Sequence, residues 1–374
     1  MASPKHTIEE VYAAIQEHGS QAKAAKALGI NVRTLERRIN RAARQGYAPE
    51  NDMVHVVPDG FHVKGTSTLY NKDGEVAMQW VKSNIDHERQ HQMAEEMIKA
   101  MADDLPKAPK IKKPKDCSDD LMAVYPLGDP HIGMLAWAEE TGQDWDMNIA
   151  REKMPAAFDR LVKSAPKCKK AVIVNLGDYL HSDNMEGVTT RSGHSLDMDG
   201  RYAKMIDIGV KILRTMIRSA LEHHEEVHVI NAVGNHDDTG ALFLNVCMIN
   251  TYENEPRVTI DPSPAPFHYV RHGKVLFGVH HGHTAKSNML MGVMATDRAR
   301  DWGETEFRYW YTGHIHHDSM KEYAGCKVES FRTLAAKDAY ATWGGYRALQ
   351  DSKCLVLHRE FGEIERHTVN IAMV

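Results

Sequence analysis

After residue 119, five apolar runs each stop abruptly in a short cluster of glycine with aspartate, asparagine or histidine. They read AVYPL-GDPH, AVIVNL-GDYLH, VHVINAV-GNHDD, VLFGV-HHGH and RYWYT-GHIHH. Helical stretches at about 148–164 and 200–224 separate the first three runs, which predicts strand-helix-strand units with parallel neighbouring strands. Ligands bind outside the carboxyl ends of such strands. The sequence therefore predicts an α/β fold in which all five clusters meet at one edge.

The side chains in these clusters are typical metal ligands. Carboxylates, an amide oxygen and neutral imidazoles together suit Mn, Fe, Zn or Ni better than calcium or magnesium alone. Histidine supplies 23 of 374 residues, so only the repetition of the pattern favours a metal site. The number of groups exceeds the needs of one tetrahedral ion and fits two ions roughly 3.5–4 Å apart that share one carboxylate. The seven candidate ligands are Asp129, His131, Asp178, Asn235, His281, His314 and His316.

The motifs also resemble those of a known family. GD-P-H (128–131), GD-YL-H (177–181), GNHD (234–237), HGH (281–283) and GHIH (313–316) are similar, in order and spacing, to the calcineurin-like metallophosphoesterase superfamily over residues 120–374. The resemblance implies a β-sandwich flanked by helices around a dinuclear centre. Mn²⁺ is the expected metal, with Fe, Zn, Ni or Mg as alternatives.

The resemblance further implies how the ligands are shared between the two ions. One ion would be held by Asp129, His131, Asp178 and His316. The other would be held by Asp178, Asn235, His281 and His314, so that Asp178 bridges the pair. His280 is expected to lie outside the ligand set because neighbouring strand residues point to opposite sides. His317 is expected to support the ligands from behind or to lie on the surface.

His236, which follows Asn235, is the expected catalytic histidine. The resemblance makes it the group that stabilises the transition state or protonates the leaving oxygen, while the ions activate a water for in-line attack on phosphorus. Asp237 is expected to orient His236. The alternative for His236 is a packing neighbour without a chemical role.

The second motif bears on the substrate. Leu180, His181 and Ser182 stand where phosphoprotein phosphatases have Val, Asp and Arg, which disfavours that activity. GDxxH with HGH is similar to the DNA repair exonuclease branch, whose histidine at this position implies a catalytic role for His181. The chain departs from that branch at its end, where KCLVLHREFGEIERHTVNI predicts a hairpin that closes the sheet.

In the loop 186–197, Arg191 is a candidate phosphate clamp, or else a solvated arginine.

Residues 7–46 predict three short helices with a helix-turn-helix pattern. Thr7 and Glu10 form a capping-box pair, and glycines 19, 29 and 46 end the helices. The third helix is expected to present a basic face to DNA phosphates or guanine edges, with a solvated protein-docking module as the alternative. Its outward residues are Arg33, Thr34, Arg37, Arg38 and Arg41. The arrangement resembles phage-encoded metallophosphoesterases with an N-terminal DNA-binding module.

Composition and patterning predict four segments. These are a helix-turn-helix domain (1–47), a small β-hairpin unit (48–83), an amphipathic helix with a Lys/Pro linker (84–118) and the phosphoesterase domain (119–374). The helix at 85–105 is a candidate surface for homo-oligomerisation. The net charge of the whole chain, -5, argues against a uniformly basic nucleic-acid coat, although residues 1–47 and 107–115 are basic. No apolar run suits a membrane span, and five scattered cysteines fit reduced thiols, so a cytoplasmic protein is expected.

These observations favour a metal-dependent phosphodiesterase that hydrolyses DNA held by its N-terminal domain. Two alternatives remain: a phosphodiesterase or phosphatase for cyclic nucleotides or other small molecules with a protein-docking module, and a DNA-binding regulator with an inactive phosphoesterase domain. The unbroken ligand set disfavours the inactive form, and the basic third helix favours DNA over small molecules.

Overall fold

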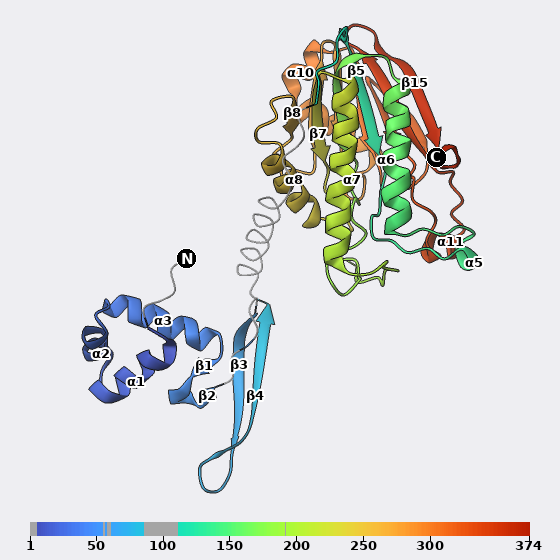
Figure 1. Cartoon of the computed structure of the whole chain (residues 1–374). Helices are drawn as coiled ribbons and strands as arrows, with labels where there is room; N and C mark the ends of the chain where they lie inside the picture. The colour runs from blue at the N-terminus through green and yellow to red at the C-terminus, as the bar shows by residue number, and fades with distance from the viewer. Residues whose placement is uncertain (1–5, 55–56, 58–60, 86–110, 191) are drawn as a thin grey trace. The chain divides into compact units, whose positions relative to one another are not determined.

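The chain divides into two compact units, residues 1–100 and 101–374, each taken by itself below (Figure 1). The computed structural model describes residues 6–54, 57, 61–85, 111–190 and 192–374. The helix expected at 85–105 and the candidate phosphate clamp Arg191 lie outside the described residues, apart from residue 85.

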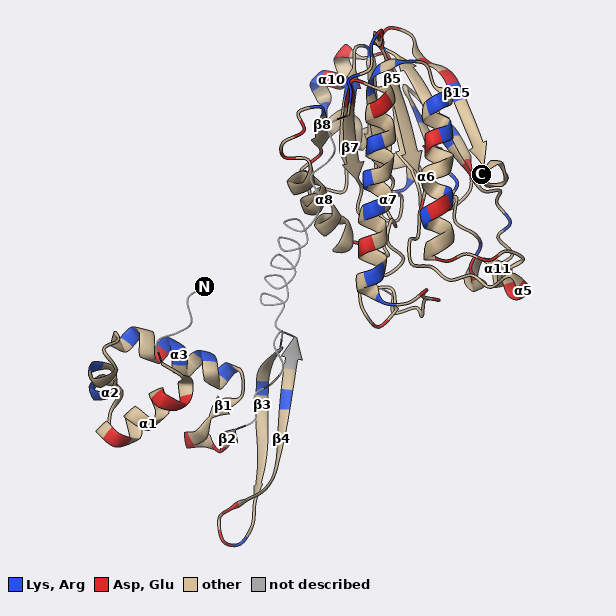
Figure 2. Cartoon of the chain, viewed as in Figure 1, with Lys and Arg blue, Asp and Glu red and all other residues tan. Residues whose placement is uncertain are grey.

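Three helices open the first unit: α1 (Ile8–His18), α2 (Gln21–Leu28) and α3 (Val32–Arg44). The capping box is present, since the Thr7 hydroxyl accepts the N–H of Glu10 and the Glu10 carboxylate accepts that of Thr7. Gly19 and Gly29 end the first two helices in the left-handed conformation. Their core consists of Val11, Ala14, Ala24, Ala25, Leu35 and Ile39. The predicted helix-turn-helix is confirmed, and Lys and Arg residues mark α2 and α3 (Figure 2).

A small β segment follows in the same unit. Strands β1 (Tyr47–Ala48) and β2 (Met53–Val54) flank the turn η1 (Pro49–Asn51). The predicted hairpin is formed by β3 (Phe61–Tyr70) and β4 (Val76–Ile85), which pair antiparallel. Its turn is closed by the Asn71 carboxamide oxygen, which accepts the N–H groups of Asp73 and Glu75, each at 2.9 Å.

The second unit contains a six-stranded sheet. Its order is β15 (Gly362–Asn370), β14 (Asp351–His358), β5 (Ser118–Leu127), β6 (Cys168–Asn175), β7 (Glu226–Asn231) and β8 (Val258–Ile260). Strands β5 to β8 run parallel, while β14 and β15 form the predicted closing hairpin. The helices α6 (Met147–Ser164) and α7 (Tyr202–His223) lie side by side over one face (Figure 1). Helix α8 (Gly240–Thr251) contacts β7 and β8.

A five-stranded sheet packs against the first. Its order is β12 (Ser319–Tyr323), β13 (Cys326–Ser330), β11 (Phe307–Thr312), β10 (Val275–Val279) and β9 (His268–His272). The three central strands are parallel and the two edge strands antiparallel. Helices α9 (Ser287–Asp297) and α10 (Ala299–Glu304) belong to the same part of the chain. Two short helices, α5 (Ala138–Thr141) and α11 (Ala339–Trp343), and the final turn η2 (Ile371–Met373) complete the unit.

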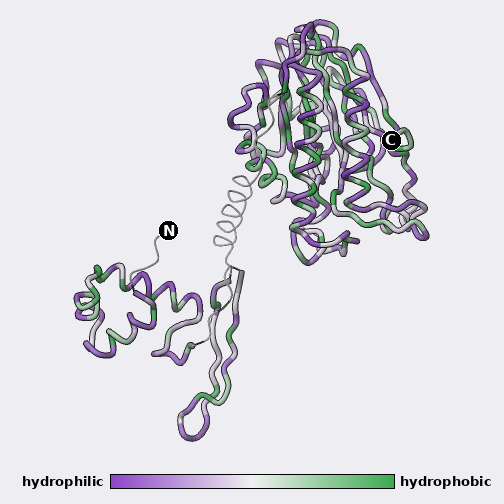
Figure 3. The backbone as a smooth tube through the Cα atoms, in the orientation of Figure 1, coloured by the Kyte–Doolittle hydropathy of each residue, from purple (hydrophilic) through white to green (hydrophobic). Residues whose placement is uncertain are grey.

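The core lies between the two sheets because successive side chains along each strand point to opposite faces of its sheet. In β10, Val275, Phe277 and Val279 face the other sheet, whereas Leu276 packs outward in a cluster with α9 residues such as Met294. Hydrophobic residues run along the strands and the covering helices (Figure 3). The predicted α/β architecture, a β-sandwich flanked by helices and preceded by a small all-α domain, is confirmed.

Register brings the predicted clusters together. Leu127, Asn175 and Asn231, the last residues of β5, β6 and β7, pair in one row, and the loops that follow carry three of the five motifs. Val279 and Tyr311 pair near the ends of β10 and β11, before the other two. All five cysteines are free, and within the described residues no helix has the length and apolar character to cross a membrane.

Candidate metal centre

Six of the seven candidate ligands form two groups of three. Asp129, His131 and His316 make one group, and Asp178, His281 and His314 make the other, with the ligand atoms of each within 4.8 Å of one another. The seventh, Asn235, places Oδ1 3.0 Å from His281 Nε2. The structure thus gathers all seven residues, from three loops of one sheet and two loops of the other.

The backbone of these loops is strained. Among the described residues, seven other than glycine have a positive φ, and five of them are candidate ligands. Such left-handed residues cost about 1–3 kcal/mol each and tend to be kept where function needs them. The five are Asp129 (φ 41°), His131 (43°), Asp178 (51°), His314 (70°) and His316 (55°).

Glycine stands directly before the candidate ligands Asn235 and His314 because the backbone there packs closely against another ligand's carboxylate. A Cβ on Gly234 would lie 2.1 Å from Asp178 Oδ1, and one on Gly313 would lie 2.7 Å from Asp129 Oδ2. No side chain fits at either position without moving a carboxylate. The sequence marked these glycines as parts of motifs but did not indicate this packing role.

Asp129 is the most deeply buried member of the first group. Its side chain is fully buried, and its two oxygens accept the N–H of His314 at 2.8 and 3.0 Å. His316 Nε2 lies 3.5 Å from Asp129 Oδ1. The Thr333 hydroxyl donates to the Asp129 carbonyl at 2.6 Å, an anchor that sequence analysis missed because Thr333 belongs to no motif.

His131 and His316 face each other in the same group, with their Nε2 atoms 3.1 Å apart. Two imidazoles that bind one ion at about 2.0–2.1 Å hold their nitrogens roughly 3–3.4 Å apart, so this spacing fits a shared cation. Burial and the neighbouring histidines hold the pKa of His131 well below its usual range. Its imidazole is therefore neutral, which is the form that binds metal.

The second group is arranged around His281. Its Nδ1 donates to the Leu176 carbonyl at 2.8 Å, which leaves Nε2 as the ligand atom, 3.2 Å from Asp178 Oδ2. Burial lowers the pKa of His281, but the carboxylates of Asp178 and Asp129 outweigh it and raise that pKa to about 9. This excess of negative charge around one imidazole suits a cation.

Asp178 is influenced by both groups. Burial raises its pKa, yet His281 in one group and His131 in the other hold it well below the usual range. Asp178 Oδ1 also accepts the N–H of His236 at 2.8 Å. A buried carboxylate between two sets of imidazoles is in the position that a bridging ligand requires.

His236 and His181 lie against the first group. Ligand atoms of His131, His181 and His236 come within 4.8 Å of one another. His181 is 1% exposed, its Nδ1 is 3.2 Å from His131 Nδ1, and burial lowers its pKa to about 3. Its Nε2 is buried without a hydrogen-bond partner among the described residues, so this nitrogen is available to a bound group.

The expectation that Asp237 orients His236 is wrong. His236 Nδ1 lies 2.8 Å from the His181 carbonyl oxygen, which takes the orienting role. Asp237 is fully buried, and its two oxygens instead accept the N–H groups of Asp178, Leu180 and Gly234 at 3.1, 3.0 and 3.2 Å. Its carboxylate therefore ties two motif loops together. Burial and the charge of Asp178 raise its pKa to about 8.

Two neighbouring histidines lie apart from the ligand groups. His280 Nδ1 contacts the Pro266 carbonyl at 3.0 Å and its ring packs on Phe267, with centroids 4.6 Å apart. His317 is exposed, with Nδ1 2.7 Å from the Ile315 carbonyl.

On α3, Arg33, Arg37 and Arg41 are exposed, and Thr34 is half-buried. The expectation that Arg38 faces outward is wrong, because its guanidinium donates to the His6 carbonyl and the side chain is partly covered. The outward basic face of the helix therefore consists of Arg33, Arg37 and Arg41 together with the exposed Arg44.

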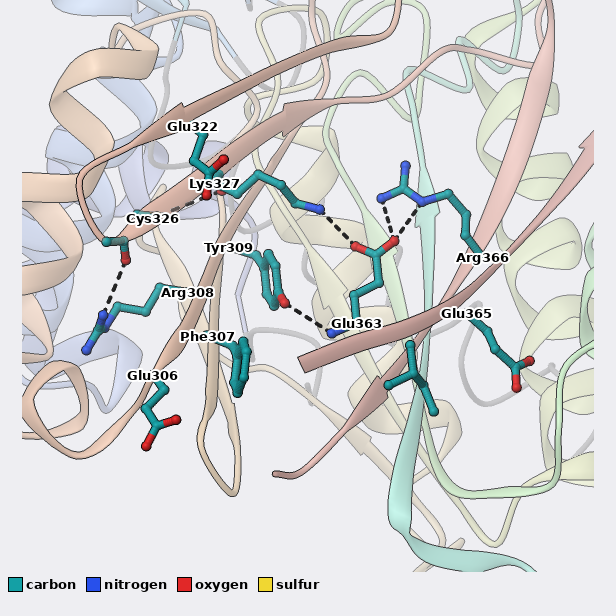
Figure 4. A pocket seen from close by; sticks show the side chains of 12 residues that line it. Glu306, Phe307, Arg308, Tyr309, Glu322, Cys326, Lys327, Glu363, Glu365 and Arg366 are labelled. Atoms are coloured by element: carbon teal, nitrogen blue, oxygen red, sulfur yellow. Dashed lines mark hydrogen bonds and ion pairs between the residues drawn. The ribbon is translucent and has the colours of Figure 1, made fainter. Parts of the chain in front are cut away.

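A cavity of about 510 Å³ lies near the amino ends of β11 and β13 and along β15 (Figure 4). Glu363 in its wall pairs with Lys327 at 2.9 Å and with Arg366 at 2.8 Å. The cavity has none of the candidate ligands in its lining, and its central charges neutralise one another. The carboxyl-end loops are therefore the better candidate site.

Comparison with known proteins gives one family model, described as "Bacterial regulatory protein, Fis family", which matches residues 9–41. No curated protein matches the chain. Solved structures that match include a dimetal phosphatase from Danio rerio, with 8% identity, 67% of this chain and 99% of that chain covered, and a TM-score of 0.37.

Two further structures match over the same share of this chain. They are Vps29 complexed with zinc from Entamoeba histolytica (14% identity, 99% of that chain, TM-score 0.29) and a predicted phosphoesterase from Streptococcus pneumoniae (10%, 98%, 0.27).

Proposed function

We propose that residues 119–374 form a dinuclear metal-dependent phosphodiesterase and that the protein hydrolyses DNA held by its helix-turn-helix. The observation that carries the proposal is the pair of donor groups, three residues each, in which five of the six residues have left-handed backbone and the buried Asp178 is influenced by both groups. Structural ion pairs do not need strained backbone at five positions.

In this proposal the first ion is held by Asp129, His131, Asp178 and His316, and the second by Asp178, Asn235, His281 and His314. Mn²⁺ is the proposed metal for this mixture of oxygen and imidazole donors, with Fe, Zn, Ni or Mg as alternatives. Two such cations, when bound, neutralise phosphoryl oxygens and lower the pKa of a coordinated water. The Leu176 carbonyl and His181 fix the orientation of two of the imidazoles.

His236 is the proposed proton donor to the leaving oxygen. Its Nδ1 is engaged by the His181 carbonyl, so Nε2 is the nitrogen left for a bound ester. The ring lies 4.8 Å from that of His131, between centroids, and therefore next to the first group. His181, with its unpartnered Nε2, is proposed to hold His131 and to hydrogen-bond the ester or the attacking water.

DNA binding is proposed for the exposed face of α3. The match to a family of bacterial regulatory proteins over residues 9–41 supports it, as do the exposed guanidiniums of Arg33, Arg37 and Arg41. Arginine at this place in a helix-turn-helix meets phosphates or base edges in the major groove.

A cytoplasmic enzyme is proposed, in keeping with its free cysteines.

Two measurements test the proposal. Anomalous scattering from crystals soaked in manganese should show two peaks between the donor groups, and an empty site would contradict the metal centre. With Mn²⁺, the triple variant R33A/R37A/R41A should cut linear duplex DNA more slowly than the wild type yet hydrolyse bis-p-nitrophenyl phosphate equally well. The matched control K23A/K26A removes exposed charges from α2 instead. Equal loss on both substrates would contradict a DNA-holding role for α3.

A further inference from the structure

Four aromatic side chains are exposed on two short helices next to the metal centre. Trp137, which precedes α5, is 63% exposed, and Tyr340 and Trp343 of α11 are 75% and 83% exposed. Tyr346, just after α11, is 58% exposed. We call these four residues the aromatic rim. Large aromatic groups gathered on a surface indicate an interaction site.

The chain connects the rim directly to the candidate ligands. Trp137 follows His131 by six positions, and α11 begins six positions after Thr333, whose hydroxyl donates to the Asp129 carbonyl. Burial lowers the pKa of His316, but Asp129 and then Asp178 outweigh it and raise that pKa, with a smaller contribution from Asp338, the N-cap of α11. Helices α5 and α11 lie side by side (Figure 1), and Trp343 Nε1 donates to the Glu140 carboxylate at 2.9 Å.

Three of the four side chains are held by local contacts while more than half of each remains exposed. The hydrogen bond to Glu140 fixes the edge of the Trp343 indole. After α11 the chain turns back at Gly344 and Gly345, so that the Tyr346 N–H reaches the Ala341 carbonyl at 3.0 Å. The ring of Tyr346 then stacks on that of Tyr340, with centroids 6.4 Å apart and planes 27° apart.

Gly344 makes this turn possible. A Cβ at position 344 would lie 2.6 Å from the ring of Tyr346. The guanidinium of Arg347 donates to the carbonyls of Thr342 and Tyr346, at 3.2 and 2.8 Å, and so closes the end of the helix. These contacts position Tyr340, Trp343 and Tyr346 in the absence of a partner.

We propose that the aromatic rim stacks unpaired nucleobases of a polynucleotide whose phosphodiester lies in the metal centre. The inference rests on the proposed function and names the substrate class as single-stranded or frayed nucleic acid. Every base has a π face, so stacking on Trp and Tyr accepts any sequence.

Charge around the rim favours bases over phosphates. Glu140 and Asp338 lie within it, and Arg347 is occupied by backbone carbonyls. These carboxylates repel a phosphate backbone and an acidic partner, whereas the ring of a base is neutral. The phosphate backbone of the polynucleotide would instead be attracted to the cations of the proposed metal centre, which leaves the bases to the rim.

Binding without cleavage tests the proposal on the full-length protein. With Mn²⁺ present, fluorescence anisotropy would compare a hydrolysis-resistant phosphorothioate oligothymidylate of roughly eight nucleotides with an abasic phosphorothioate oligomer of equal length. The wild type should bind the oligothymidylate about 10-fold more tightly, and W343A and Y346A should each lose most of that difference. An oligouridylate arm separates DNA from RNA preference.

Matched variants separate stacking from damage to the fold. W343F keeps a ring and should retain most of the binding, whereas G344A keeps all four rings but displaces Tyr346 and should weaken it. F361A removes an equally exposed ring (67%) from the β14–β15 turn and should change nothing. Equal binding by wild type and W343A, or no preference over the abasic oligomer, would overturn the proposal. Either result is what a rim that docks a protein would give.

Hydrolysis of bis-p-nitrophenyl phosphate by the wild type with Mn²⁺, measured in parallel, separates the two proposals. Hydrolysis without base-dependent binding overturns the aromatic rim and leaves the proposed phosphodiesterase intact. Base-dependent binding without hydrolysis overturns the metal centre and supports the rim as a nucleic-acid surface.

Discussion

Asp129 and His314 lie on loops of different sheets, and both carboxylate oxygens of Asp129 accept the backbone N–H of His314, at 2.8 and 3.0 Å. One loop follows β5 of the six-stranded sheet and the other follows β11 of the five-stranded sheet. The candidate metal centre is therefore also a junction between the two halves of the sandwich. Changes to a ligand should accordingly affect both metal content and stability.

The first prediction concerns metal stoichiometry. With Mn²⁺, H316A and H314A should each retain about one ion per chain, because each removes a ligand from one donor group only. D178N should lose both ions, since Asp178 is the proposed bridge. Elemental analysis of dialysed protein measures the ratio, and H317A is the control because its exposed imidazole lies outside both donor groups, with Nδ1 at the Ile315 carbonyl. Retention of one ion by D178N would exclude a bridging role.

The second prediction concerns His236. H236A should keep both ions and lose about 10²–10⁴-fold in kcat, the usual contribution of a positioned general acid. The deficit should be larger on DNA than on bis-p-nitrophenyl phosphate, because a nitrophenolate leaves without needing a proton. Steady-state rates on both substrates, with metal content measured on the same samples, check this. An equal deficit on both would argue for transition-state stabilisation instead of proton donation.

The third prediction concerns the glycine packed on Asp178. G234A should lower the free energy of unfolding by about 1–3 kcal/mol and reduce metal content, because the new Cβ overlaps a ligand carboxylate. Thermal unfolding and elemental analysis measure both effects. G292A is the matched control: it adds the same methyl group within α9, where nothing lies within 4 Å, and should be neutral or stabilise by about 0.5–1 kcal/mol. A stable, fully metal-loaded G234A would contradict the close packing.

The features that the sequence predicts, and that the fold brings together, share a physical reason. The strand ends are local features, since an apolar run followed by Gly and a polar residue specifies both the end of the strand and the group carried there. Register in a parallel sheet then brings such ends together without further information, as with Leu127, Asn175 and Asn231. The sandwich and the gathering of the seven candidate ligands followed from these two facts.

The errors concern partners that are set by tertiary packing. Asp237 was assigned to its chain neighbour His236, but its carboxylate reaches three N–H groups on two loops. Arg38 was placed outward by helical spacing, whereas the segment before α1 passes close enough for it to bind the His6 carbonyl. Thr333 and the aromatic rim belong to no motif, so only the folded chain brings them to the site.

The last prediction concerns the ion pairs of the cavity in Figure 4. Burial raises the pKa of Glu363, but its contacts with Arg366 and Lys327 outweigh this and lower it below the usual value. A carboxyl group with a lowered pKa stabilises the folded state above its unfolded pKa of about 4.3, and this contribution disappears as the pH falls through the folded pKa. E363Q should therefore be less stable than the wild type at pH 7 by about 1–3 kcal/mol.

The difference should shrink as the pH falls below about 4, because the wild-type carboxyl group then becomes neutral like the amide. Urea unfolding of both proteins across this range measures it. E365Q is the matched control two positions along β15: the side chain of Glu365 is 49% exposed and pairs only with His367 among the described residues, at 3.2 Å. Its stability should follow that of the wild type at every pH. If the free energies of unfolding of E363Q and the wild type differ by the same amount at every pH, then the shape of Glu363, not its charge, stabilises the fold.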